Sequence, residues 1–193
     1  TQFYAGDGIG KSTLILQAEL EAGANVPIYG EYELKRPLKV LHIQTERPPR
    51  EAYQRMIMMM QKIPVNFGNF YFEAGLQGYD MAFQTDRLAV IEKLKKAKSE
   101  FGEIDWLHID PIYAWTSSDL STSTGTGYIN DMIRKIQKDI CKTVSYNHHP
   151  NRGVKDRETG TRIGEDMYGN RFLSANCTGV FHIKANPGGN GTT

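Results

Sequence analysis

Short apolar segments alternate with segments of helical periodicity along most of the chain. Apolar runs bounded by turn residues are typical of buried strands. They predict strands over residues 1–5, 40–44, 69–73, 104–110, 143–147 and 179–184. Between these runs, apolar residues recur at the spacing of an α-helix. This spacing predicts helices over residues 11–22, 49–62, 88–101 and 129–140.

This alternation of strands and helices indicates an α/β fold with a mostly parallel sheet flanked by helices. The chain has 193 residues, of which 39% are hydrophobic and 23% charged, which suits one globular domain. We expect this domain to span residues 1–193. We also expect it to be the trimmed core of a longer chain, because the sequence opens at Thr1 and stops in a glycine-rich turn.

The bulk properties exclude several classes of protein. The net charge is +1, so the chain as a whole is not a strongly basic nucleic-acid binder. Its two cysteines cannot form a disulfide framework and fit a reduced, cytoplasmic setting. No apolar run approaches the roughly 20 residues of a membrane span, so we expect no membrane partner.

The strongest motif lies at the start of the chain and reads Ala5-Gly6-Asp7-Gly8-Ile9-Gly10-Lys11-Ser12-Thr13. It matches the phosphate-binding P-loop, with alanine in place of the usual first glycine. Gly8 and Gly10 allow a turn whose backbone N–H groups point at phosphate oxygens, and the following helix adds its positive end. Lys11 then reaches the β- and γ-phosphates, and the hydroxyl of Ser12 is a Mg²⁺ ligand. The motif therefore predicts binding of ATP with Mg²⁺.

A carboxylate is needed to hold the metal ion from the side opposite Ser12. Asp110 ends the apolar strand predicted over 104–110, at the carboxyl end, where α/β folds place their ligands. We therefore expect Asp110 to lie beside Ser12 and help to hold Mg²⁺. Asp105, at the opposite end of the strand, should lie far from the phosphates.

Two further groups at strand ends have open roles. Glu46 follows the strand predicted over 40–44 and could activate the attacking water, or it could be a surface glutamate near a helix start. His148 and His149 follow the strand over 143–147. They could hydrogen-bond the γ-phosphate or its water, or one of them could serve packing alone.

These features occur in a characteristic order. After the P-loop come Thr45-Glu46-Arg47-Pro48-Pro49 with Arg55, the strand ending at Asp110, and the pair His148-His149. Together they resemble the RecA-like ATPase core of ring-shaped replicative helicases, most closely the plasmid RepA type and next the DnaB type. The likeness covers nearly the whole chain.

The resemblance implies specific roles. Glu46 matches the catalytic glutamate, Arg55 an arginine that packs on the adenine, and His148 and His149 the segment that senses the γ-phosphate. It also places the strand over 143–147 between the P-loop strand and the strand of Asp110, which brings His148 close to Lys11.

The resemblance also implies partners. Single-stranded DNA would be contacted by two polar, glycine-rich segments, 116–127 and 150–170, which fit neither periodicity. The chain would form a homo-oligomeric ring, a hexamer, in which a basic residue from one subunit completes its neighbour's site. Lys184 and Arg171 are the candidates for this residue, although Asn186 and Thr178 occupy the positions where an arginine is expected.

The leading hypothesis is thus Mg²⁺-dependent ATP hydrolysis coupled to movement along nucleic acid or to its unwinding. A filament-forming recombinase of the same fold and an ATP-gated binding or loading module are alternatives. A small-molecule kinase is another, with the segment 150–171 as its arginine-containing lid. Stimulation of phosphate release by single-stranded DNA separates a motor from a kinase.

Overall fold

A computed structural model describes residues 1–4, 10–63, 65–120, 122–148 and 177–183. Its strands form one sheet in the order β3-β2-β4-β5-β1-β6, and every pairing is parallel. The strands are β1 (Gln2–Tyr4), β2 (Val40–Gln44), β3 (Phe70–Glu73), β4 (Trp106–Asp110), β5 (Thr143–His148) and β6 (Val180–His182). The predicted α/β fold with a parallel sheet is confirmed.

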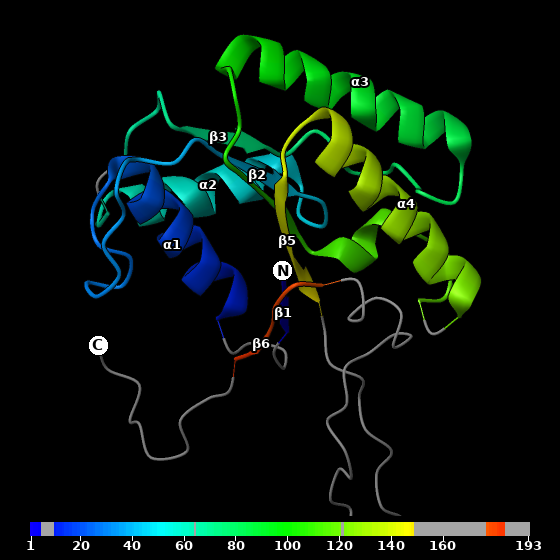
Figure 1. Cartoon of the computed structure of the whole chain (residues 1–193), viewed down its shortest axis with the longest axis horizontal. Helices are drawn as coiled ribbons and strands as arrows, with labels where there is room; N and C mark the ends of the chain where they lie inside the picture. The colour runs from blue at the N-terminus through cyan, green and yellow to red at the C-terminus, as the bar shows by residue number, and fades with distance from the viewer. Residues whose placement is uncertain (5–9, 64, 121, 149–176, 184–193) are drawn as a thin grey trace, which may run out of the picture.

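Helices cover both faces of this sheet. They are α1 (Lys11–Ala24), α2 (Pro49–Met60), α3 (Gln84–Phe101) and α4 (Ser123–Asp139), with a short 3₁₀ helix, η1 (Ile112–Trp115). Figure 1 shows α1 and α2 on one side of the sheet and α3 and α4 on the other. None of the helices in the described ranges combines the length and the apolar character that a membrane span requires.

The alternation of side chains along each strand divides the interior into two cores. Leu41, Ile43, Leu107 and Ile109 belong to the core beneath α3 and α4. Val40 belongs to a second, smaller core, which α1 and α2 build against β2 and β3. Because both faces are covered, β2 is buried along its whole length, as expected for a parallel strand with helices on both sides.

Two sequence predictions in the chain after β3 are corrected by the structure. The segment 116–127 is not a loop throughout, because α4 begins at Ser123 within it. The hydroxyl of Thr122 accepts a hydrogen bond from the amide of Gly125 at 3.1 Å and so caps this helix. The strand predicted from residue 104 begins only at Trp106, because the carboxylate of Asp105 instead binds Arg36 and the amide of Lys39.

The order of the strands positions the functional residues. β5 lies between β4 and β1, as the resemblance implied. The carboxyl ends of all these parallel strands meet at one edge of the sheet, so the start of α1, Glu46, Asp110 and His148 share that edge. The segment 150–170 lies outside the described residues.

Candidate nucleotide-binding site

The start of α1 has the backbone geometry that a phosphate-binding loop needs. Gly10, directly before the helix, has φ 88° and ψ 16°, a left-handed conformation that favours glycine. Lys11 follows and is only 6% exposed. Its Nζ donates a hydrogen bond to the carbonyl oxygen of His148 over 2.9 Å. The other residues predicted to cradle phosphate before Gly10 (Ala5, Gly6, Asp7, Gly8 and Ile9) lie outside the described residues.

The predicted metal ligands lie side by side. The hydroxyl of Ser12 donates a hydrogen bond to Oδ1 of Asp110 over 3.1 Å. The same oxygen accepts a bond of 2.7 Å from Nδ2 of Asn147 on β5. The expected position of Asp110 beside Ser12 is thus confirmed, while its role as a metal ligand stays a prediction. Asp105 lies at the opposite end of β4, as expected, in an ion pair with Arg36.

Asp110 is ionised in spite of its burial. Burial by itself would raise the pKa of this carboxyl group. The attraction of His42 and the hydrogen bonds from Asn147 and Ser12 outweigh burial and lower the pKa. A charged carboxylate beside a hydroxyl is a pair of hard oxygen donors, which suits Mg²⁺. The residues present therefore fit the metal ion that a P-loop uses.

Glu46 follows β2 at the same edge of the sheet. The main chain continues the pairing with β4, because the amide of Thr45 donates to the carbonyl oxygen of Asp110 over 2.9 Å. Oε1 of Gln44 accepts a bond of 2.9 Å from the amide of Glu46. The carboxylate of Glu46 is exposed and accepts a hydrogen bond of 2.6 Å from the hydroxyl of Tyr113. Glu46 is therefore available at the edge that carries Ser12 and Asp110.

Arg55 on α2 faces the start of α1. Its guanidinium donates a hydrogen bond to the hydroxyl of Thr13. Burial and, after it, the neighbouring Arg47 lower the pKa of Arg55. Arg55, Ser12 and Asp110 line one small recess. Thr13 and Arg55, both expected to bind nucleotide, thus lie together, while packing of Arg55 on an adenine stays a prediction.

His148 lies next to Lys11, but the contact differs from the one that an imidazole sensor would make. The backbone carbonyl of His148 bonds the lysine, and the whole residue is buried. A role for the side chain stays a prediction. His149 and the basic candidates Lys184 and Arg171 lie outside the described residues.

Sequence reasoning missed a layer of buried polar groups on the α1 face of the sheet. His42 Nδ1 lies 2.6 Å from Oε2 of Glu19, on α1. His108 Nδ1 lies 2.7 Å from the hydroxyl of Ser145 on β5. Burial lowers the pKa of His108 to about 3, so its ring is neutral. The signal was present, because polar residues stand at alternate positions in the second half of β2 and β4 and along β5, on the face toward α1: His42 and Gln44, His108 and Asp110, and Ser145 and Asn147.

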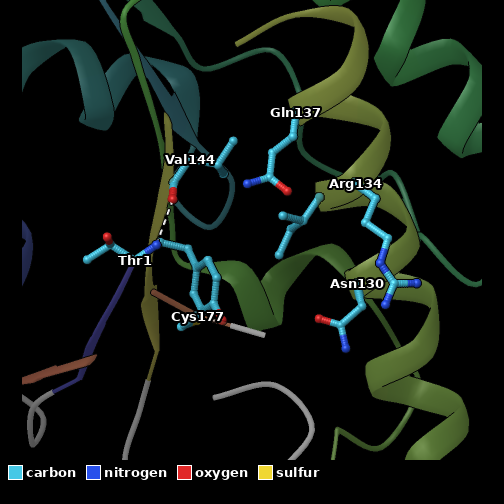
Figure 2. A pocket seen from close by; sticks show the side chains of 8 residues that line it. Thr1, Asn130, Arg134, Gln137, Val144 and Cys177 are labelled. Carbon is cyan, nitrogen blue, oxygen red and sulfur yellow. Dashed lines mark hydrogen bonds between the residues drawn. The ribbon is translucent and has the colours of Figure 1, made fainter. Parts of the chain in front are cut away.

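A second hollow lies away from this edge, between α4 and the strands β1 and β5. Its volume is about 90 Å³. Figure 2 shows Asn130 and Gln137 of α4 on one side of it and Thr1 and Val144 on the other. Among the described residues, none of those predicted to bind nucleotide or metal lines it. The candidate site is therefore the strand edge at Lys11 and Asp110.

Comparison with known proteins supports this choice. No curated protein sequence matches the chain. The family model described as an AAA domain matches residues 1–154. This match covers most of the chain, including the P-loop, Glu46, Asp110 and His148. The chain therefore belongs to the AAA-domain family of P-loop ATPases.

Proposed function

We propose that this chain is the ATPase core of a helicase-like motor, which hydrolyses ATP with Mg²⁺ and moves along single-stranded DNA. The observation that carries the proposal is the convergence of Lys11, Ser12, Asp110 and Glu46. They come from the start of α1 and from the ends of two neighbouring strands, β2 and β4. Binding of phosphate alone would not need Glu46 at this edge, whereas hydrolysis needs a base for the attacking water.

Each residue has a distinct task in this reaction. The ammonium of Lys11, held by the carbonyl of His148 in this structure, would turn to the β- and γ-phosphates of ATP. Ser12 and Asp110 would hold Mg²⁺, which neutralises charge on the phosphates as the terminal bond breaks. Glu46 would orient a water molecule in line with that bond and accept its proton.

The contact between Lys11 and His148 supports the coupling to movement. β5 ends at His148, and the chain continues from there into the segment 150–170. When ATP takes the ammonium away from the carbonyl, the end of β5 loses a hydrogen bond. We propose that this change passes along the chain into the segment 150–170. In the helicases that the chain resembles, the loop at the corresponding position contacts DNA.

The decisive substitution is Glu46→Gln, which keeps the shape of the side chain and removes the base. ATP binding should stay unchanged and hydrolysis should fall by about 10²–10⁴-fold, the contribution of a positioned base. Glu51→Gln, in the first turn of α2, is the matched control and should remain active. Normal hydrolysis by Glu46→Gln would refute the assignment.

Single-stranded DNA separates the motor from the kinase alternative. We expect it to stimulate phosphate release from ATP by the wild-type chain. A kinase would show no such response and would transfer the phosphate to an added small molecule. If DNA does not change the rate of phosphate release, the chain is an ATPase and the proposed motor function is refuted.

We also propose that the chain works as a homo-oligomeric ring, a hexamer, completed by Lys184 or Arg171 from the neighbouring subunit. The particle mass with an ATP analogue and Mg²⁺ tests the ring. Mixing the double variant Lys184→Ala/Arg171→Ala with Glu46→Gln tests the shared site, because some interfaces then regain two intact halves. Partial recovery of hydrolysis is expected. Full activity of the double variant alone would show that one chain completes its own site.

A further inference from the structure

The short helix η1 brings an aromatic hydroxyl to Glu46. η1 follows β4 and carries Tyr113, whose hydroxyl lies 2.6 Å from Oε1 of Glu46. A hydroxyl that donates to a charged carboxylate makes a short hydrogen bond, roughly twice as strong as a bond between neutral groups. Glu46 and Tyr113 are 67 positions apart in the sequence. The folding of β2 against β4 makes them neighbours.

Glu46 needs such a partner because its side chain is exposed. Its backbone is fixed by the bond from its amide to Gln44. Within the described ranges, Tyr113 is the group that donates a hydrogen bond to its carboxylate. A free glutamate side chain samples many rotamers, and ordering it costs conformational entropy. Tyr113 therefore selects one orientation of the carboxylate.

Tyr113 is itself held firmly. Its neighbours in η1, Ile112 and Trp115, are each 1% exposed and anchor the helix in the core beneath α3 and α4. The carbonyl oxygen of Trp115 accepts a bond of 2.8 Å from the amide of Met81. The hydroxyl of Thr45, next to Glu46, donates to the carbonyl oxygen of Pro111 over 2.6 Å. The bond between Thr45 and Pro111 thus joins the segments that carry Glu46 and Tyr113, in addition to the bond between Tyr113 and Glu46 themselves.

We propose that Tyr113 is a positioning residue that holds the carboxylate of Glu46 in the orientation needed to activate water. This inference rests on the proposed function, in which Glu46 is the base. The hydroxyl occupies Oε1 and leaves Oε2 to accept the proton of the water. Tyr113 acts through Glu46 and needs no contact with ATP. Rates depend steeply on such geometry, since a misplacement of about 1 Å can cost 10²-fold.

The test is Tyr113→Phe, which removes the hydroxyl and keeps the half-buried ring. We expect kcat for ATP hydrolysis to fall by about tenfold, a part of the 10²–10⁴-fold that a positioned base supplies. The KM for ATP and the affinity for a fluorescent ATP analogue should not change. Tyr53→Phe is the matched control, because the hydroxyl of Tyr53 lies on α2 and bonds the carbonyl oxygen of Phe72 instead of Glu46. It should keep full kcat, and thermal unfolding should show that both variants are folded.

A background of Glu46→Gln separates positioning from a general structural effect. In single-turnover measurements, Tyr113→Phe should slow hydrolysis in the wild-type background and have no further effect on Glu46→Gln. An unchanged kcat, or a higher KM at unchanged kcat, would overturn the role of Tyr113. If Glu46→Gln loses hydrolysis while Tyr113→Phe does not, the proposed function stands and the positioning role is refuted. Absence of hydrolysis by the wild-type chain would overturn both.

Discussion

Lys11 at the start of α1 donates a hydrogen bond from Nζ to the carbonyl oxygen of His148 at the end of β5, over 2.9 Å. The ammonium is almost fully buried, and a buried charge without hydrogen-bond acceptors is strongly unfavourable. The carbonyl therefore stabilises Lys11 at the place where the P-loop needs it. It also makes the end of β5 sensitive to anything that takes the ammonium away.

Replacement of Lys11 tests this relationship first. Lys11→Ala should weaken ATP binding by about 10- to 100-fold, since a hydrogen bond to a charged group contributes about 1.5–3 kcal/mol. Titration with a fluorescent ATP analogue measures the loss, and phosphate release should fall with it. Lys96→Ala, at an exposed position of α3, is the control and should bind normally. Unchanged hydrolysis by Lys11→Ala would contradict the assignment of Lys11 and this edge of the sheet to ATP binding.

Asp110 offers a test of the metal site, with a control at Asp105, the residue directly before the same strand. Asp110→Asn keeps the size of the side chain but removes its charge. The Mg²⁺ concentration for half-maximal hydrolysis should rise by about 10- to 100-fold, the usual cost when a carboxylate that supports a metal is lost. Asp105→Asn, at the other end of β4, breaks only the contacts with Arg36 and Lys39. Its Mg²⁺ requirement should equal that of the wild type.

The sheet was predictable because short segments with apolar residues, bounded by turn residues, alternate with segments of helical periodicity. The start of α4 was not, because Gly125, Gly127 and the neighbouring serines and threonines have low helix propensity. The helix begins there because Thr122 caps it. Local sequence does not show whether a cap will form, since that depends on how the preceding turn folds.

Part of the candidate site was also predictable from the sequence, and part was not. Lys11, Ser12 and Asp110 were predictable because a motif and a strand end define them. The bond between Tyr113 and Glu46 was not, because it depends on how two strand ends lie beside each other. The pair of Glu19 and His42 was missed for a similar reason. A glutamate inside a helix looks like a surface residue until its partner on another element is known.

The buried pair of Glu19 and His42 predicts how the free energy of unfolding depends on pH. Burial by itself would lower the pKa of His42, but the charge of Glu19 and the hydrogen bond between them outweigh it, and the pKa is raised. The negative charge of Asp110 on β4 also raises the pKa of His42, whereas the positive charge of Arg55 on α2 lowers it. The neighbouring ring of His108 is neutral. Burial raises the pKa of Glu19. Both groups hold protons more tightly in the folded chain.

A raised pKa of the folded histidine adds stability that is fully present below its unfolded value, about 6.5. This stability is lost as the pH rises through the folded pKa. We expect the free energy of unfolding in urea to fall as the pH rises above about 6.5, because the folded pKa of His42 lies above that value. Glu19→Gln should flatten this slope. Glu92→Gln, at an exposed position of α3, should keep it. Equal slopes in all three proteins would contradict the assignment.

Two glycines of α4 give a last test, in which the same substitution should have opposite effects. A Cβ at Gly125 would lie 2.2 Å from the carbonyl oxygen of Asp119. This oxygen cannot easily move, because it accepts hydrogen bonds from both the amide and the hydroxyl of Thr122, the residue that caps the helix. Apart from the helix's own backbone, a Cβ at Gly127 would meet no atom of the described residues within 4 Å.

Alanine is the better helix former by about 1 kcal/mol, so Gly127→Ala should raise the free energy of unfolding by about 0.5–1 kcal/mol. Gly125→Ala gains the same helix propensity but forces the turn at Asp119 away from α4. Such crowding costs about 1–3 kcal/mol and should outweigh the gain, so this variant should be destabilised. Urea unfolding of the two variants and the wild type measures whether each substitution raises or lowers the free energy of unfolding. A shift in the same direction for both would contradict the close contact between Gly125 and the turn at Asp119.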